Sequence, residues 1–341
     1  MSKKPTMQDV ATHANVSIAT VSYVLNGVKK VSDKTKEKVF ESIRELNYYP
    51  DSSAVSLSRR KSNLIGILIP MLGDSPAAMF KKNIYYNEFV SGIEVISRKN
   101  NYDTMISGVA EPEDVKGWVK KRNLDGLIYI GELPENLYEE LIQLDVPLVL
   151  IDTYAKEAAN YNNVRIQDER GGYLATKHLI ELGHTKVAFV PTNLQTSPVD
   201  LHRMNGYRRA LSESGIAFDE DLVFESYDVK FEQPALVNRI VTADPAPTGI
   251  VTVSDVLAIG VINELKKLGK SVPDDYSVIG FDDLIISEYI TPPLTTVRQD
   301  IFTKGRTAAE LVIASIEEES HGHNTVVLPV ELVERESTRK L

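Results

Sequence analysis

Apolar side chains recur at three- and four-residue spacing along the first fifty residues, and this pattern predicts a group of short helices. Thr6, with Asp9 three residues later, has the spacing of a capping box that begins the first helix. Asn15 suits the tight turn that follows, because asparagine tolerates left-handed backbone angles. Ser17 caps a second helix, whose apolar face comprises Val21, Val24 and Leu25. The pattern predicts a helix-turn-helix, although an ordinary helical hairpin has the same caps and spacing.

A third helix is expected to close the core of this N-terminal segment. Ser32 stands at its start, and Val39, Ile43 and Leu46 recur at helical spacing behind it. Pro50 ends it, because the residue before a proline disfavours the helical region. Residues 1–50 are therefore predicted to form an all-α head. Residues 51–62 are too polar and too short for a stable helix on their own, and a flexible linker is the simplest interpretation.

From residue 63 the pattern changes to continuous apolar runs that alternate with amphipathic helices. Strands are predicted at 64–69, 103–108, 126–130, 147–152, 186–191, 222–227, 249–253, 277–281 and 325–333. Helices are predicted at 85–99, 113–121, 135–144, 171–182, 200–214, 233–243, 257–268 and 302–316. Runs buried on both sides and separated by helices are typical of parallel sheets covered by helices. The two series in tandem predict an α/β core of two parallel-sheet lobes.

The charge distribution divides the chain at the same place. Residues 1–61 hold eleven of the 38 Lys and Arg and six of the 48 Asp and Glu, a net charge of +5, whereas the remainder has a net charge of −15. A small basic head on an acidic body concentrates attraction for phosphate in one region. The chain has no cysteine, which excludes disulfides and thiolate metal sites. We expect a cytoplasmic protein, because no signal peptide or membrane-length apolar stretch is present.

The residue identities in the helix-turn-helix are more informative than its apolar pattern alone. Residues 19–27 read Ala-Thr-Val-Ser-Tyr-Val-Leu-Asn-Gly, and this segment resembles the DNA-binding domain of the lactose-repressor (LacI/GalR) family. The resemblance covers nearly the whole chain and implies a ligand-controlled transcription regulator, whose core resembles periplasmic sugar-binding proteins. It also implies a hinge at 51–62 and a core at 63–341. We expect the first lobe at about 63–161 plus 293–323, and the second at about 162–292 plus 324–341.

The resemblance further implies which side chains meet DNA. Ile18, Ala19 and Tyr23 would face base edges, and Tyr23 stands where the family often has arginine. The hinge would fold into a helix on DNA, with Leu57 as an apolar wedge in the minor groove. The expected DNA-binding residues are Thr6, Ser17, Ile18, Ala19, Thr20, Ser22, Tyr23, Asn26, Ala54, Leu57, Arg59 and Arg60.

Polar residues follow predicted strands in both lobes, at the edge where open parallel sheets bind ligands. Each alone is also explained as a turn former or a helix cap. Carboxylates and a guanidinium together suit the hydroxyls of a sugar, and the family's effector contacts fall at matching positions. The expected effector-binding residues are Tyr85, Tyr86, Asp152, Arg203, Ser254 and Asp282. Ser254 stands where the family commonly has asparagine, and residues 73–82 are an addition that could form a lid or a longer loop.

We therefore predict a dimeric repressor that binds a near-palindromic DNA operator and is controlled by a sugar or sugar derivative. A purine or another corepressor fits the same scaffold. A dimer is expected because no leucine heptads follow the last predicted strand. No catalytic residue, metal site or cofactor is expected, because the phosphate-binding and nucleophile motifs of enzymes are absent. A secreted binding protein or an enzyme without a DNA role would leave the helix-turn-helix unexplained.

Overall fold

The computed structural model describes residues 5–25, 31–49, 61–70, 84–109, 112–131, 135–141, 143–226, 233–318 and 323–341. The chain divides into two compact units, Met1–Ser62 and Asn63–Leu341. Most of the predicted hinge and the additional residues 73–82 lie outside the described residues. Each unit is considered by itself.

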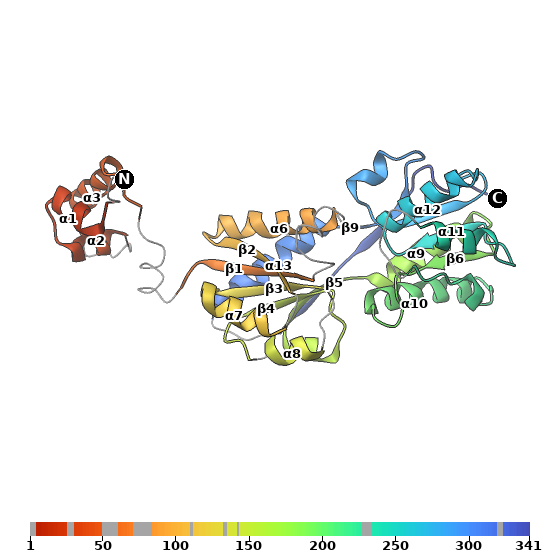
Figure 1. The fold of residues 1–341 in the computed structure, drawn as a ribbon, viewed down its shortest axis with the longest axis horizontal. Coiled ribbons are helices and arrows are strands. Elements are labelled where there is room, and N and C mark those ends of the chain that lie inside the picture. Colours follow the sequence, from red (N-terminus) through yellow and green to blue (C-terminus); the bar gives the residue numbers. More distant parts are fainter. Residues whose placement is uncertain are drawn as a thin grey trace. The chain divides into compact units, whose positions relative to one another are not determined.

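In its described residues the first unit forms α1 (Met7–Ala14), α2 (Ile18–Leu25) and α3 (Asp33–Glu45), which Figure 1 labels. The predicted capping box is present: the Thr6 amide donates to Asp9 Oδ2 at 2.7 Å, and the Asp9 amide donates to Thr6 Oγ1 at 3.3 Å. Asn15 has a φ of 52° at the turn. Buried side chains of these helices, with Tyr48 after α3, form one small core, made of Val10, Ala11, Ala14, Val21, Val24, Val39 and Tyr48. The predicted helix-turn-helix and third helix are confirmed.

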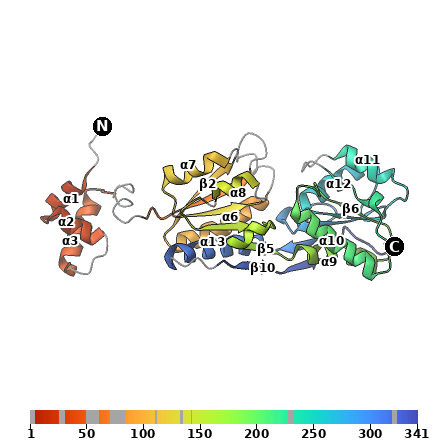
Figure 2. The same ribbon diagram turned by 90° about the horizontal axis from the view of Figure 1, so that it is seen from below.

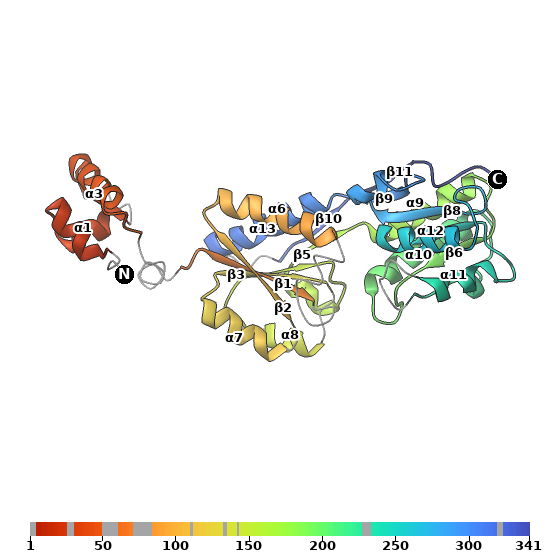
Figure 3. The same cartoon turned by 45° about the horizontal axis from the view of Figure 1, so that its top comes forward.

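The first lobe of the second unit is built on a parallel sheet with the order β10-β5-β4-β3-β1-β2. Its strands are β1 (Leu64–Pro70), β2 (Asp103–Val109), β3 (Gly126–Ile130), β4 (Leu148–Ile151), β5 (Asn162–Ile166) and β10 (Thr325–Leu328). The helices that cover one face are α6 (Tyr85–Lys99) and α13 (Ile301–Glu318), and those on the other are α7 (Pro112–Arg122) and α8 (Glu135–Leu141), as Figure 3 shows. The 3-10 helix η1 (Lys156–Asn160) precedes β5.

The second lobe has a sheet with the order β11-β9-β8-β7-β6, in which β11 alone is antiparallel to its neighbour. Its strands are β6 (Val187–Val190), β7 (Gly249–Thr252), β8 (Ser277–Asp282), β9 (Thr295–Gln299) and β11 (Val330–Val333). Its helices are α9 (Asp168–Glu181), α10 (Pro198–Glu213), α11 (Pro234–Val241) and α12 (Asp255–Lys267), with 3-10 helices η2 (Glu220–Leu222) and η3 (Ile285–Glu288). The predicted two-lobe α/β core is confirmed.

Three strands lie differently from the expected lobe boundaries. β5 belongs to the first sheet although the second lobe was expected from 162, and β9 belongs to the second sheet although the first lobe was expected to resume at 293. The single strand predicted at 325–333 is wrong, because its first half, β10, pairs with β5 and its second half, β11, pairs with β9. The chain thus crosses after Ile166, after Gln299 and at Pro329. Apolar patterning identifies strands but does not tell which sheet supplies the partner.

The strand predicted at 222–227 is also wrong in the residues that the structure describes. Only Leu222 of this segment belongs to η2, and Val223 makes an isolated bridge to Phe189. The Phe224 and Ser226 amides donate to the carbonyls of Phe189 and Pro191, so the segment follows β6 without forming a continuous strand. None of the helices in the described part of the chain combines the length and the apolar character that a membrane-spanning helix needs.

Two glycines allow α9 and α10 to pack in close contact. A Cβ atom on Gly172 would lie 2.0 Å from the carbonyl oxygen of Arg203, and one on Gly206 would lie 1.9 Å from the carbonyl oxygen of Glu169. Neither position has room for a side chain, so the backbones themselves meet at this crossing. The Arg203-x-x-Gly206 spacing in the sequence therefore sets where Arg203 lies against α9.

Candidate functional site

The second helix of the head exposes the side chains that were expected to meet DNA. Ile18 and Tyr23 are large apolar or aromatic residues with 44% and 49% of their surface exposed. Ser17, Ala19 and Thr6 are also exposed, and Thr20 and Ser22 are half-buried. Ser17 accepts from the Thr20 amide at 3.1 Å and so caps this helix. The other expected DNA-binding residues, Asn26, Ala54, Leu57, Arg59 and Arg60, lie outside the described residues.

A network of polar side chains connects the two lobes of the core. Lys304, in the first turn of α13, is completely buried. Its ammonium donates to Asp152 Oδ2 and Oδ1 at 2.9 and 3.0 Å, to the Tyr85 hydroxyl at 3.2 Å and to Gln299 Oε1 at 2.7 Å. Gln299 Nε2 donates to Asp282 Oδ1 at 2.6 Å. Tyr85, Asp152 and Lys304 belong to the first lobe, while Gln299 and Asp282 belong to the second. We call these five residues the cross-lobe network.

Arg203 lies beside this network in the second lobe. Its Nε donates to Asp168 Oδ1 at 2.8 Å, and its Nη1 donates to the carbonyl of Val253. The guanidinium also lies over the ring of Phe281, 3.5 Å from the ring centroid. Tyr154 donates to the other oxygen of Asp168 at 2.5 Å. Buried Arg203 therefore has a fixed orientation before any ligand binds.

Burial and neighbouring charges have opposite effects on the pKa values of the carboxylates at this site. Burial raises the pKa of Asp282 to about 6, although the charges of Arg203 and Lys304 and the hydrogen bond from Gln299 lower it. Burial likewise raises the pKa of Asp168 against the charge of Arg203. Burial, together with Asp152, keeps the pKa of Tyr85 well above its ordinary value, so its hydroxyl stays a donor.

Two of these carboxylates have unusual backbone geometry. Asp152 directly follows β4 with a φ of 55°, and Asp282 ends β8 with a φ of 119°. Aspartate tolerates the left-handed region better than most residues, so the φ of Asp152 is also explained by the turn after β4, whereas the φ of Asp282 lies outside that region and is rarer. The backbone strain at Asp282 is therefore consistent with a functional role for this residue.

The remaining expected effector residues have clear structural contacts. Tyr86 packs edge-on against Tyr85, with ring centroids 5.4 Å apart. Ser254 Oγ accepts from the Leu257 amide at 3.3 Å and caps α12. The alternative interpretation of Ser254 as a helix cap is therefore supported, while its role toward a ligand stays a prediction.

Sequence reasoning missed Lys304, Gln299 and Asp168. The burial of Lys304 could have been predicted from the sequence, because Lys304 lies at helical spacing between Ile301 and Ala308 on the apolar face of α13. All three residues are buried. A lysine at such a position needs a buried partner. The sequence does not identify that partner, which is 152 residues away.

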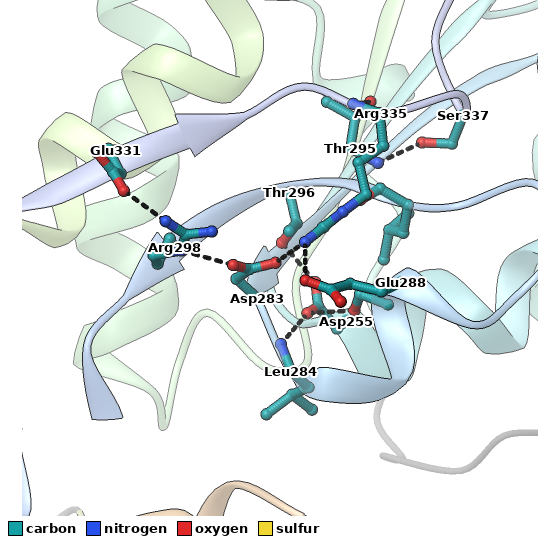
Figure 4. A network of polar contacts seen from close by, with 12 residues as sticks. Asp255, Asp283, Leu284, Glu288, Thr295, Thr296, Arg298, Glu331, Arg335 and Ser337 are labelled. Atoms are coloured by element: carbon teal, nitrogen blue, oxygen red, sulfur yellow. Dashed lines mark hydrogen bonds and ion pairs between the residues drawn. The ribbon is translucent and has the colours of Figure 1, made fainter. Parts of the chain in front are cut away.

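A second polar cluster, shown in Figure 4, supports the segment that follows Asp282. Asp255 is fully buried and accepts from the Leu284 amide and from the hydroxyls of Ser287 and Thr296. Burial, with the charge of Asp282, raises the pKa of Asp255 to about 8. Asp283 accepts from Arg298 at 2.6 Å and from Arg335 at 2.7 Å (Figure 4). These contacts hold β8, η3 and β9 together, so Asp282 sits on a rigid support.

No three His, Asp or Glu side chains in the described part of the chain gather in a way that could hold a metal ion. The polar groups of the network and of Arg203 beside it are of the kinds that hydrogen-bond to hydroxyl groups. These groups are two carboxylates, an amide, a phenol and an ammonium in the network, together with the guanidinium of Arg203.

Comparisons with known proteins decide the family. Residues 6–51 match the model of bacterial regulatory proteins of the lacI family, and residues 176–338 match a periplasmic binding protein-like domain. The HTH-type transcriptional repressor PurR of Vibrio atlanticus (strain LGP32) is 33% identical over 345 residues, covering 98% of this chain and 99% of that protein. The chain belongs to the lacI family.

Other relatives and solved structures agree. The ribose operon repressor of Haemophilus influenzae is 33% identical over 342 residues, covering 98% of this chain and 99% of that protein. The lac repressor dimer bound to operator and the anti-inducer ONPF has a TM-score of 0.84 at 26% identity, covering 99% of this chain and 100% of that one. The CelR–cellobiose complex has a TM-score of 0.75 at 27% identity, covering 98% and 99%. The prediction of a DNA-binding transcriptional regulator rather than an enzyme is confirmed.

Proposed function

We propose that the protein is a dimeric repressor whose affinity for a near-palindromic operator is controlled by a neutral sugar bound between the two lobes. The observation that carries this proposal is the cross-lobe network, in which Lys304 and Asp152 of the first lobe meet Gln299 and Asp282 of the second. A ligand that hydrogen-bonds to these residues senses the distance between the lobes. Because the operator is DNA, we place the protein in the cytoplasm.

The charges of the network, and of the Arg203–Asp168 pair beside it, favour an uncharged ligand. Lys304 neutralises Asp152, and Arg203 neutralises Asp168. Asp282 remains, and with a pKa raised to about 6 it is mostly ionised at pH 7. An anionic ligand such as a sugar phosphate would meet this excess negative charge, whereas sugar hydroxyls donate to carboxylates and accept from the guanidinium. Solved relatives are named as complexes with ribose and with cellobiose, which is consistent with this ligand class.

A purine corepressor is the second candidate, because PurR proteins of several Vibrio species are 31–33% identical to this chain. The two candidate ligands predict opposite effects on the affinity for the operator. A sugar inducer would weaken operator binding, and a purine corepressor would strengthen it.

The mechanism follows from the position of the network. A ligand that contacts Asp152 and Asp282 together must favour one spacing of the two lobes over others. In a dimer formed by the lobes, a change in that spacing alters how the two heads engage their half-sites. We propose that Arg203 and Asp282 hold the ligand from the second lobe, Asp152 and Tyr85 hold it from the first, and Tyr86 and Ser254 complete the contact set.

The test is a thermal-shift screen of neutral sugars, sugar phosphates and nucleobases, followed by operator binding measured by fluorescence anisotropy. We expect a neutral sugar to raise the melting temperature and to change operator affinity. Asp282→Ala should abolish that response while leaving ligand-free operator binding nearly intact. Asp145→Ala, at an exposed position before β4, is the matched control and should respond like the wild type. If Asp282→Ala keeps the full response, the proposed ligand contacts are in the wrong place.

The oligomeric state has its own test. Light scattering at micromolar concentration should give the mass of two 38.0 kDa chains. A tetramer or a monomer would contradict the proposed dimer.

A further inference from the structure

A separate pocket of about 480 Å³ lies where β5 and β10 of the first lobe meet α9 and α10 of the second, a junction that Figure 2 shows from below. Its size falls in the usual range for small-molecule sites, roughly 300–1,000 Å³. The ionisable groups in its wall, other than Tyr154, are Arg165, Arg170, His202, Arg209, Asp168 and Glu169. None of the residues proposed above to contact the sugar lines this pocket.

The two carboxylates of the pocket already have partners. Asp168 is paired with Arg203, and Glu169 is paired with Arg209. Arg165 and Arg170 have no ion-pair partner among the residues that the structure describes, so their positive charges are not compensated within the pocket. The pocket therefore has a net attraction for negative charge.

Packing holds one of these arginines in place. The guanidinium of Arg165 lies 4.7 Å from the centroid of the Tyr154 ring, and the His202 ring stacks on the same ring at 4.1 Å. The Nε atom of Arg165 is buried and has no acceptor among the described residues. A buried donor without an acceptor is uncommon in folded proteins and calls for a specific explanation. An acceptor supplied by a ligand is such an explanation, because Arg165 is one of the residues that line the pocket.

We propose that this pocket binds a small organic oxyanion, carrying a phosphate or two carboxylates, through Arg165 and Arg170. Guanidinium groups bind both kinds of oxyanion through paired, charge-assisted hydrogen bonds. The pocket shares the Tyr154–Asp168 hydrogen bond with the surroundings of Arg203. An anion that displaces Tyr154 or Asp168 therefore also changes the position of Arg203 beside the cross-lobe network.

Calorimetric titration of the full-length protein with potassium phosphate and with citrate tests the site directly, with potassium chloride at matched ionic strength as the reference. We expect saturable binding of at least one of the two anions, and the one that saturates identifies the preferred group. Arg165→Gln and Arg170→Gln should each weaken it by about tenfold or more. Arg170 is exposed, so its variant tests the site even if Arg165→Gln fails to fold.

Arg98→Gln is the matched control, because Arg98 is an exposed arginine of α6 whose ion pair, within the described part of the chain, is with its neighbour Glu94 at the surface. It should bind the anion like the wild type. Two results would overturn the proposal: no saturable binding of either anion beyond that of chloride, or equal weakening by Arg98→Gln and Arg170→Gln. The second result would mean that general charge, rather than a built site, attracts the anion.

The link to the operator rests on the proposed function and is measured separately. With an operator fragment selected from a random library, saturating anion should change the affinity of the wild type, and the change should shrink in Tyr154→Phe, which lacks the hydrogen bond to Asp168. Anion binding with unchanged operator affinity would overturn the link and leave the site in place. Absence of any operator selection by the wild type would instead overturn the proposed function.

Discussion

Lys304→Met tests whether the buried lysine holds the cross-lobe network together. Methionine is similar in length and flexibility but has neither charge nor donors. The substitution removes the ammonium that donates to both oxygens of Asp152, to Tyr85 and to Gln299. Asp152 is then left with the Tyr85 hydroxyl, 3.2 Å away, and Gln299 Oε1 loses its donor.

The expected cost follows from burial. Removing one partner of a buried ion pair typically costs about 3–5 kcal/mol, because the other charge stays behind uncompensated. The Asp152 side chain is 17% exposed, so water offsets part of this cost, and methionine adds favourable apolar burial. We expect Lys304→Met to lower the free energy of unfolding by about 2–3 kcal/mol. Replacing both partners, in Lys304→Met with Asp152→Asn, should recover all but about 1 kcal/mol, because no buried charge then remains.

The assay is urea unfolding followed by the fluorescence of Trp118. This is the single tryptophan of the chain; it lies in α7 and packs against the apolar core on the α7 and α8 face of the first lobe's sheet. Lys99→Met, at an exposed position at the end of α6, is the control and should change stability by less than about 0.5 kcal/mol. If Lys304→Met is as mild as this control, or if the costs of the two single substitutions simply add in the double variant, the network does not hold the lobes in the way described.

Three further predictions concern other parts of the molecule. Because burial raises the pKa of folded-state Asp255 from 3.8 to about 8, the folded state binds this proton more tightly than the unfolded state, and the free energy of unfolding should fall as pH rises from about 4 to 8. Asp255→Asn should flatten this pH dependence in urea titrations, and an unchanged dependence would refute the assignment. Gly206→Ala should cost about 1–3 kcal/mol of unfolding free energy by forcing α9 and α10 apart, whereas Gly117→Ala, with nothing within 4 Å, should be neutral or mildly stabilising in the same measurement. Tyr23→Ala should change half-site preference by about 1–3 kcal/mol per affected base pair, and unchanged selection from a random operator library would count against base reading by Tyr23.

Local features of the sequence were sufficient to predict the helices of the head and most elements of the core. A capping box such as Thr6 with Asp9 needs only residues three apart, and the apolar face of α2 lies within one helix. The family resemblance added Asp152, Arg203 and Asp282, and the structure places Asp152 and Asp282 in one network, with Arg203 beside it.

Only the tertiary structure decided how distant segments pair. Whether β10 and β11 are one strand or two depends on which sheet edges accept their backbone groups, and those edges belong to β5 and β9, far away in the chain. The sequence alone does not explain a lysine on the apolar face of α13; the folded structure does, because it places Asp152 next to Lys304. Periodicity within an element reflects burial, which is a local pattern, whereas pairing of strands and of charges depends on contacts between residues that only the folded chain brings together.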